Sequence, residues 1–542
     1  MIPFDRFGND VDNQEMGSFG KLPQLWQEDD TGNKSNATHG LSFSSEYHEI
    51  DQQQPLKAFH DLDALFLDTT PPFPRYEHQM QELANIESQY SELVRPHANP
   101  KRTKTSPDVV RYEVSGHKLS TDAVIRLGGE KFIQSCSSSI NDISMPSHPY
   151  SSSFSVFSNQ KAKDIELIQN LLLSAENVSQ QQFERSSKLL NWCDTLSSSS
   201  GNPIQRLVHY FSKALREKIA NETGRISFHG PGKEHVDYIE ERTLSPNPTS
   251  VSVYQKLPFF QAGKFSGVQA VVDAVAGATK VHIIDLSIKQ GVQCTILMQA
   301  LASQPTCPIK HLKITAVGTN FKEKIEQTGH WLKSFAESIN LSFSFNVAMV
   351  GDMLDFKEDL LELDTEEALA VFSSYGLWGM IGQQDRLESL MKVIKSINPR
   401  VMVVIEGAAN LNSPNFVDRF IEALFFYGAF FDALEDCMDR EDEDRSITES
   451  VYMGNGIWSI VATEGAERVI RNVHINVWRK FFARFGMKET ELSMSSLYQA
   501  NLVTGIFSCG NSCTFDMDGN CLIIGWKGSP IQCISAWKFS SG

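Results

Sequence analysis

Residues 281–286 read Val-His-Ile-Ile-Asp-Leu, a short apolar run that is interrupted only by a histidine and an aspartate. A run of this kind is typical of a strand that is buried on both faces of a sheet. The same signal recurs at 312–317, 343–347, 368–372 and 401–405, and helical spacing occupies three of the four intervals. Repeated strand–helix units predict a mostly parallel sheet that is covered by helices.

The sequence after residue 405 predicts a different ending for this sheet. Pro414 opens a long helical pattern that carries aromatic residues on one face. Residues 513–526 then form a hairpin pattern with Asp518-Gly519 at the turn, and residues 531–539 form a further strand pattern. An antiparallel hairpin that closes a parallel sheet is the arrangement of methyltransferase-like, Rossmann-type folds. We therefore expect an α/β fold of this type.

The region before the sheet has helical spacing and predicts a helical cap. Residues 164–219 repeat apolar side chains at intervals of three and four, and Pro203 stands at the first turn of one of the helices. These side chains either form the core of a helical bundle or offer a surface for pairing with a related chain. The six residues that define the two faces are Ile165, Ile168, Leu172, Leu207, Phe211 and Leu215.

Residues 1–158 are dominated by Gln, Asn, Ser, Asp and His, which predicts a disordered region without a core of its own. Residues 59–67 alternate acidic and apolar positions and are either a docking segment or a chance apolar cluster. The basic cluster Lys101, Arg102 and Lys104 is of the kind that a nuclear import receptor binds. We place the domain boundary at residue 158 and expect the folded domain to span 159–540.

Composition restricts the possible functions. The 542 residues include 49 Lys and Arg against 66 Asp and Glu, a formal net charge of −17, which opposes unassisted binding to a phosphate backbone. The sequence has no apolar run of membrane-spanning length and does not begin like a signal peptide, so we expect an intracellular protein. Its nine cysteines are expected to be free thiols, and their spacing lacks the paired CxxC of a zinc site.

The loop after the first strand is where a Rossmann-type sheet would bind a cofactor. A cofactor loop needs several glycines, but only Gly291 is present between Asp285 and the next helix. Motifs of metalloproteases, serine hydrolases and phosphate-binding loops are also missing. We expect Asp285 to cap the following turn rather than contact a ligand, and His282 to be a hydrogen-bonded structural residue. No catalytic, cofactor-binding or metal-binding residue is therefore predicted.

The motif Val281, His282, Ile283, Ile284, Asp285 and its surroundings resemble the plant GRAS family of transcriptional regulators, which includes the DELLA and SCARECROW-like proteins. Ser535, Ala536 and Trp537 are similar to the terminal motif of that family, and the resemblance extends over residues 160–540. By this resemblance the domain divides into leucine-rich region I (160–220), the VHIID region (240–305), leucine-rich region II (321–353), the PFYRE region (363–457) and the SAW region (460–540).

The resemblance implies a nuclear transcriptional regulator that is not an enzyme and has no cofactor. Its partners would be DNA-binding transcription factors and other GRAS proteins, in homo- or heterodimers, so that it would contact DNA indirectly. The sequence lacks the DELLA string and the TVHYNP segment, so we do not expect gibberellin-triggered degradation. The domain is similar to a DELLA-like branch, which suggests a role in plant development or in arbuscular mycorrhizal root symbiosis.

Two other functions are compatible with the expected fold. The chain could be an adenosyl-cofactor methyltransferase or a small-ligand-binding protein that uses the cleft beyond Asp285. It could also be a direct, sequence-specific DNA-binding factor, although that function needs a basic face that the linear sequence does not show.

Overall fold

The structure is a computed structural model that describes residues 120–138, 159–224, 248–304 and 308–540. All of these residues belong to one compact unit. The strands are β1 (Lys280–Asp285), β2 (His311–Gly318), β3 (Phe343–Met349), β4 (Ala368–Ser374), β5 (Val401–Gly407), β6 (Met487–Thr490), β7 (Cys513–Asp518), β8 (Cys521–Trp526) and β9 (Ser529–Phe539). The helices are α3 (Thr121–Ser138), α4 (Asn159–Ser179), α5 (Phe183–Leu196), α6 (Pro203–Glu222), α8 (Pro248–Lys256), α9 (Pro258–Ala274), α10 (Val292–Ala302), α11 (Lys322–Ser338), α12 (Gln384–Ile397), α13 (Phe416–Cys437), α14 (Glu443–Ile447), α15 (Gly454–Val461), α16 (Ile475–Arg484) and α17 (Met494–Thr504).

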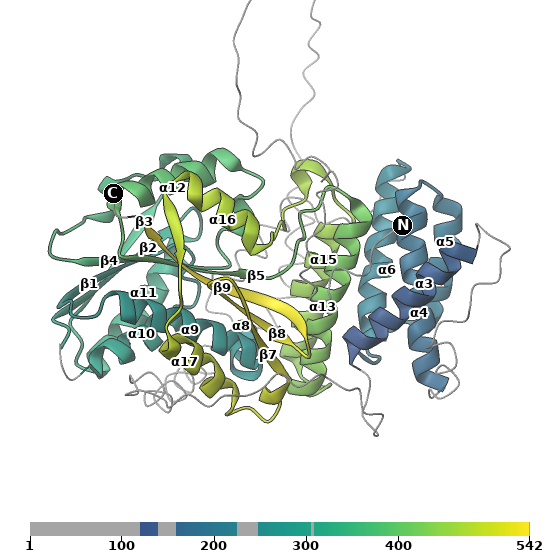
Figure 1. Cartoon of the computed structure of the whole chain (residues 1–542), viewed down its shortest axis with the longest axis horizontal. Coiled ribbons are helices and arrows are strands. Elements are labelled where there is room, and N and C mark those ends of the chain that lie inside the picture. Colours follow the sequence, from purple (N-terminus) through teal and green to yellow (C-terminus); the bar gives the residue numbers. More distant parts are fainter. Residues whose placement is uncertain (1–119, 139–158, 225–247, 305–307, 541–542) are drawn as a thin grey trace, which may run out of the picture. The chain divides into compact units, whose positions relative to one another are not determined.

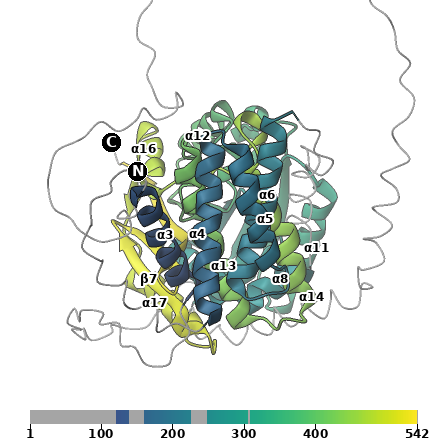
Figure 2. The same cartoon turned by 90° about the vertical axis from the view of Figure 1, so that its right-hand side faces the viewer.

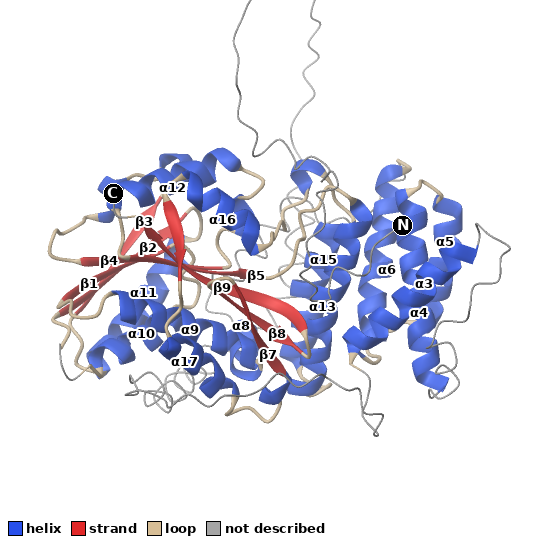
Figure 3. Ribbon diagram, viewed as in Figure 1, coloured by secondary structure: helices blue, strands red, loops and turns tan. Residues whose placement is uncertain are grey.

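The described strands form one sheet in the order β3-β2-β1-β4-β5-β9-β8-β7, with β6 paired to β9 (Figure 3). Strands β1 to β5 pair in parallel, whereas every pair that includes β7, β8 or β9 is antiparallel. The predicted α/β fold, with a mostly parallel sheet and an antiparallel C-terminal hairpin, is therefore confirmed. Gly519 lies in the hairpin turn with a φ of +59°, a conformation that glycine adopts at little cost.

Strand β1 lies inside the sheet, where Val281 pairs with Leu312 of β2 and with Ala368 of β4. Its residues from Val281 to Asp285 are all buried, because helices cover both faces of the sheet (Figure 1). Figure 1 shows α9, α10 and α17 on one face and α12 and α16 on the other. This double covering explains the unbroken apolar run in the sequence.

Helix α13 is the long helix that the sequence predicts, but it begins at Phe416 rather than at Pro414. The side chain of Asn415 accepts hydrogen bonds from the backbone N–H groups of Val417 and Asp418. Asparagine is a strong N-cap because its side-chain oxygen satisfies amides that have no partner inside the helix. The cap therefore sets the start of the helix two residues after the proline.

The predicted helical cap consists of α4, α5 and α6, which contact one another (Figure 2). Helices α4 and α6 pack on α13, and α6 also packs on α15 (Figure 1). Arg206 of α6 is buried and lies 2.9 Å from Glu435 of α13 and 3.1 Å from Glu449. Arg445 pairs with the same two carboxylates at 2.6 and 3.0 Å. A buried charge needs such partners, so this network fixes the cap at one position against the rest of the unit.

The structure corrects the prediction of disorder for one part of residues 1–158, because residues 121–138 form helix α3 and pack against α4 and α13. Val124, Ile125 and Phe132 of this helix are buried. A Cβ atom on Gly428 of α13 would lie only 2.8 Å from Ile125 Cδ1, so the two helices approach closely at this glycine. The apolar residues of α3 form only a weakly amphipathic pattern, so the helix gains its stability from this tertiary packing. The docking segment 59–67 lies outside the described residues.

Candidate functional site

The carboxyl end of β1 is the first place to look for a ligand site in this fold. Asp285 is fully buried there, and its Oδ1 accepts a hydrogen bond of 2.9 Å from the backbone N–H of Ser287. Its Oδ2 accepts a second hydrogen bond of 2.8 Å from Gln293 Nε2. Burial raises the pKa of Asp285. The carboxyl group is thus engaged by its own loop and by the helix that follows, and it caps the turn as the sequence predicts.

The loops after β1 and β4 lie in direct contact. The hydroxyl of Ser287 accepts a hydrogen bond of 2.7 Å from the backbone N–H of Ser374. A Cβ atom on Gly376 would lie 2.9 Å from Ser287 Cβ, which is closer than ordinary side chains approach. Strands β1 and β4 are neighbours at the point where the order of the strands in the sheet reverses, and Rossmann-type proteins bind their cofactor at such a point. The two loops are therefore held in direct contact at Ser287, Ser374 and Gly376.

Glu406, at the end of β5, completes this cluster. Its Oε1 accepts a hydrogen bond of 2.8 Å from the backbone N–H of Leu377, in the loop after β4. Its Oε2 is buried and has no hydrogen-bond partner. Burial raises the pKa of Glu406 to about 7, so the buried carboxyl is protonated over a wide range of pH. Tyr375, beside it, donates a hydrogen bond of 2.7 Å to Gln532 Oε1 of β9.

His282 is buried inside β1 and has a neighbour at each ring nitrogen. Nε2 lies 2.8 Å from the hydroxyl of Thr315, and Nδ1 lies 3.0 Å from a carboxylate oxygen of Glu367. Burial, with Lys313 nearby, lowers the pKa of His282 to about 3, so the imidazole is neutral. The other motif residues, Val281, Ile283 and Ile284, are buried apolar side chains of the sheet.

The terminal motif lies in β9 beside β5, where Ser535, Ala536 and Trp537 are all buried. Trp537 Nε1 donates a hydrogen bond of 2.9 Å to Ser535 Oγ, and the indole ring lies 4.7 Å from the ring of Phe482, centre to centre. The ring contact joins β9 to α16. Strand β9 pairs with β5 and with β8, so the motif lies in the interior of the sheet.

The six residues proposed as interaction determinants lie inside the helical cap. Each is at most 1% exposed, so they contact other parts of the described unit and not the solvent. Their role in association stays a prediction, and an association through this region would use the outer side chains of the same helices. The nuclear import cluster Lys101, Arg102 and Lys104 lies outside the described residues.

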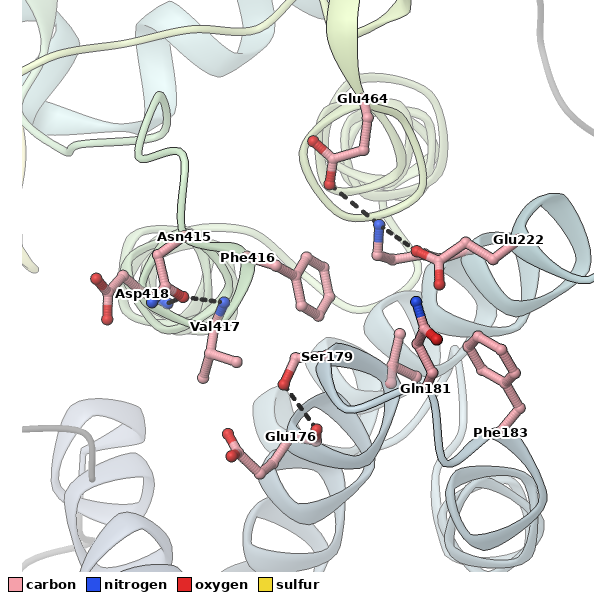
Figure 4. A pocket seen from close by; sticks show the side chains of 12 residues that line it. Glu176, Ser179, Gln181, Phe183, Glu222, Asn415, Phe416, Val417, Asp418 and Glu464 are labelled. Atoms are coloured by element: carbon pink, nitrogen blue, oxygen red, sulfur yellow. Dashed lines mark hydrogen bonds and ion pairs between the residues drawn. The ribbon is translucent and has the colours of Figure 1, made fainter. Parts of the chain in front are cut away.

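A pocket of about 770 Å³ lies where the cap meets the start of α13 (Figure 4). The ends of α4 and α6, the turn before α5, the first residues of α13 and Glu464 line it. The lining holds more acid than base. Its charged and aromatic side chains are Glu176, Glu222, Asp418, Glu464, Lys218, Phe183 and Phe416.

Lys218 carries the positive charge of this pocket and is 4% exposed. Its ammonium lies 2.9 Å from Glu222 and 3.0 Å from Glu464, and 4.6 Å from the centre of the Phe416 ring. Arg419 of α13 is also buried and reaches Glu464 at 2.5 Å. Both cations are therefore neutralised within the protein, and Glu176 and Asp418 add negative charge to the lining.

Sequence reasoning did not find this pocket. Lys218 follows Leu207, Phe211 and Leu215 on the apolar face of α6. A lysine on an apolar helix face is the one feature of the sequence that could have indicated a buried charge here. Its partner Glu464 is distant in the sequence and comes close only in the folded chain.

None of the helices in the described ranges combines the length and apolar character that a membrane crossing requires. Within the same ranges, no three His, Cys, Asp or Glu side chains lie together as a metal site would need.

Comparisons with known proteins agree with this architecture. The model of the GRAS domain family matches residues 167–538. DELLA protein 2 of Medicago truncatula is 30% identical over 384 residues, which cover 70% of this chain and 68% of that protein. DELLA protein RGL3 of Arabidopsis thaliana is 31% identical over 379 residues, which cover 70% of each chain. The crystal structure of SCL7 from Oryza sativa has the same fold, with a TM-score of 0.61 and 24% identity over 69% of this chain and 99% of that chain. The chain thus belongs to the GRAS family of plant transcriptional regulators.

Proposed function

We propose that this protein is a nuclear transcriptional co-regulator that acts without catalysis, by binding DNA-binding transcription factors and other GRAS proteins. The observation that carries the proposal is the contact between the loops after β1 and β4. In a Rossmann-type sheet these loops border the crevice that holds a cofactor. Here Ser287, Ser374 and Gly376 bring the two loops into direct contact, which favours a scaffold over an enzyme.

The charge of the chain supports an indirect role at DNA. A formal net charge of −17 repels a phosphate backbone and attracts basic proteins. Entry into the nucleus through Lys101, Arg102 and Lys104 is part of the proposal. We expect the protein to act either in plant development or in root symbiosis.

The pocket between the cap and α13 is the surface that we assign to a DNA-binding partner. Proteins that bind DNA carry segments rich in Lys and Arg, and the acidic lining of the pocket complements their charge. Phe183 and Phe416 can hold the aliphatic stems and the charged ends of such side chains. Other GRAS proteins would bind the outer surface of α4, α5 and α6, because the inner faces of these helices are buried.

The test compares complexes that are isolated from plant nuclei with the full-length chain and with a double variant, Glu176→Gln/Asp418→Asn. This variant removes two negative charges from the pocket and leaves Glu222 and Glu464 in place to hold Lys218. Its matched control is Glu358→Gln/Asp359→Asn, which removes two exposed carboxylates from outside the pocket lining.

We expect the wild type and the control to recover DNA-binding factors and GRAS relatives in equal amounts. The pocket variant should recover several-fold less of the DNA-binding factors while it retains the GRAS relatives. Recovery of neither class by the wild type would contradict the proposed function. Equal recovery of DNA-binding factors by all three proteins would contradict the assignment of the pocket alone.

A further inference from the structure

Two cysteines that are distant in the sequence meet at the end of helix α13. Cys437 is the last residue of α13, and Cys509 lies 72 residues later, between α17 and β7. Their sulfur atoms are 2.7 Å apart, and the thiol of Cys437 donates a hydrogen bond to the sulfur of Cys509. No rearrangement of the backbone is needed to bring these two sulfurs within reach of each other.

This pair is open to small reagents in a way that most other described thiols are not. Cys437 and Cys509 are both partly exposed, whereas Cys193, Cys294 and Cys521 are buried. A hollow of about 230 Å³ also opens onto Cys437, with Lys256 and Met438 among the residues that line it. A molecule of the size of hydrogen peroxide therefore has a path to the pair.

We propose that Cys437 and Cys509 form an oxidation-sensitive dithiol, which a peroxide converts into a disulfide between the end of α13 and the segment before β7. The proposal is independent of the function proposed above, because it concerns the chemistry of two side chains that lie outside the acidic pocket.

The reaction has two steps and consumes one peroxide. The thiolate of Cys509 attacks one peroxide oxygen and the O–O bond breaks, which gives a sulfenic acid and hydroxide. The hydroxide takes up the proton that Cys509 lost on ionisation and becomes the first water. The sulfur of Cys437 then attacks the sulfur of Cys509, the S–O bond breaks, and a second water leaves with the proton of Cys437. Two thiols lose two electrons to the peroxide, which is reduced to two waters.

The local environment assigns these two roles. The hydrogen bond from Cys437 lowers the pKa of Cys509, because it stabilises the thiolate that accepts it. The same hydrogen bond, together with burial, raises the pKa of Cys437. Since the thiolate is the nucleophile, Cys509 reacts first and Cys437 resolves the sulfenic acid.

A third cysteine lies close by and must be distinguished from the pair. Cys513 begins β7 and is buried, and burial raises its pKa to about 12. Three thiols can indicate zinc, but within the described ranges no group of three such side chains is placed to hold a metal ion. The geometry therefore favours oxidation of the pair over metal binding, with Cys513 left as a thiol.

The test uses the full-length chain, which is reduced, freed of reductant and then treated with hydrogen peroxide. Alkylation and peptide mass spectrometry identify which cysteines have become linked. The variants are Cys437→Ser, Cys509→Ser and, as the matched control, Cys513→Ser.

We expect the wild type and the Cys513 variant to lose two thiols per chain and to yield a peptide that links residues 437 and 509, which dithiothreitol reverses. The Cys437 and Cys509 variants should give no internal link. The linked protein should also unfold at a higher temperature, because the cross-link restricts the unfolded chain.

Three results would overturn the proposal. The first is the absence of a link between residues 437 and 509 in the oxidised wild type. The second is a link between Cys509 and Cys513 in its place. The third is oxidation of the buried cysteines at the same rate as oxidation of Cys437 and Cys509. Peptide mapping of the wild type decides the question even if a variant fails to fold.

Discussion

Replacement of Glu406 by glutamine should remove the contribution of this one buried acid to the pH dependence of stability. The carboxyl group is buried at the end of β5, and its Oε1 accepts a hydrogen bond from the N–H of Leu377. Glutamine keeps an acceptor at this position and has nearly the same shape, but it cannot ionise. The substitution therefore tests the buried acid without creating a cavity.

The magnitude follows from the pKa of Glu406, which burial raises from 4.5 to about 7. Because the folded protein holds this proton more tightly than the unfolded chain, the group favours folding at low pH. Its contribution falls as the pH rises from the unfolded pKa to the folded one. The loss between pH 5 and pH 8 is about 2.5 kcal/mol, at about 1.4 kcal/mol for each unit of pKa difference, and most of it occurs below pH 7.

Urea unfolding of the wild type and of Glu406→Gln at several pH values between 5 and 8 measures this effect. The stability of the variant relative to the wild type should rise by about 2.5 kcal/mol across the range. Glu358→Gln, at an exposed position, should leave the pH dependence unchanged. Parallel curves for the wild type and Glu406→Gln would refute the reasoning, because they would mean that Glu406 titrates at its usual pKa in the fold.

Two further substitutions test the packing around the predicted motifs. Trp537→Ala removes a buried ring that packs on Phe482 and should lower the free energy of unfolding by about 3–5 kcal/mol. Its control is Trp192→Ala, at a side chain that is 49% exposed, which should lower it by under about 1 kcal/mol. Equal thermal shifts for the two tryptophan variants would contradict a structural role of the terminal motif. Gly376→Ala places a Cβ atom 2.9 Å from Ser287 Cβ and should lower the free energy of unfolding by about 1–3 kcal/mol, because it forces the two loops apart. Its control is Gly379→Ala, whose added Cβ atom would meet no other atom within 4 Å. Equal thermal unfolding of the two glycine variants would contradict the close contact of the loops.

The sheet could be predicted from the sequence because its buried strands are short runs of apolar residues. The run at residues 281–286 and its four repeats correspond to β1 to β5, and the Asp518-Gly519 turn corresponds to the hairpin of β7 and β8. Such patterns involve only residues that are close together in the chain, so they can be recognised without knowledge of the fold. The roles of Asp285 and His282 followed from the same reasoning, since both lie in or beside a buried strand.

The remaining features depend on contacts between distant residues. Helix α3 has a weak pattern of its own and is held by α13, where Gly428 leaves space for Ile125. The acidic pocket requires Lys218 and Glu464, which are 246 residues apart. The pair Cys437 and Cys509 could not be identified from spacing either, because nothing in the local sequence shows that their chain segments meet.

The most direct test of the central claim is a titration of the purified, full-length protein with S-adenosylmethionine, followed by isothermal calorimetry. The loops after β1 and β4 are in direct contact at the place where related folds bind a cofactor. We therefore expect no saturable binding at any accessible concentration of the cofactor. Saturable binding at one site per chain, with a matching rise in thermal stability, would contradict the account and would direct attention to catalysis.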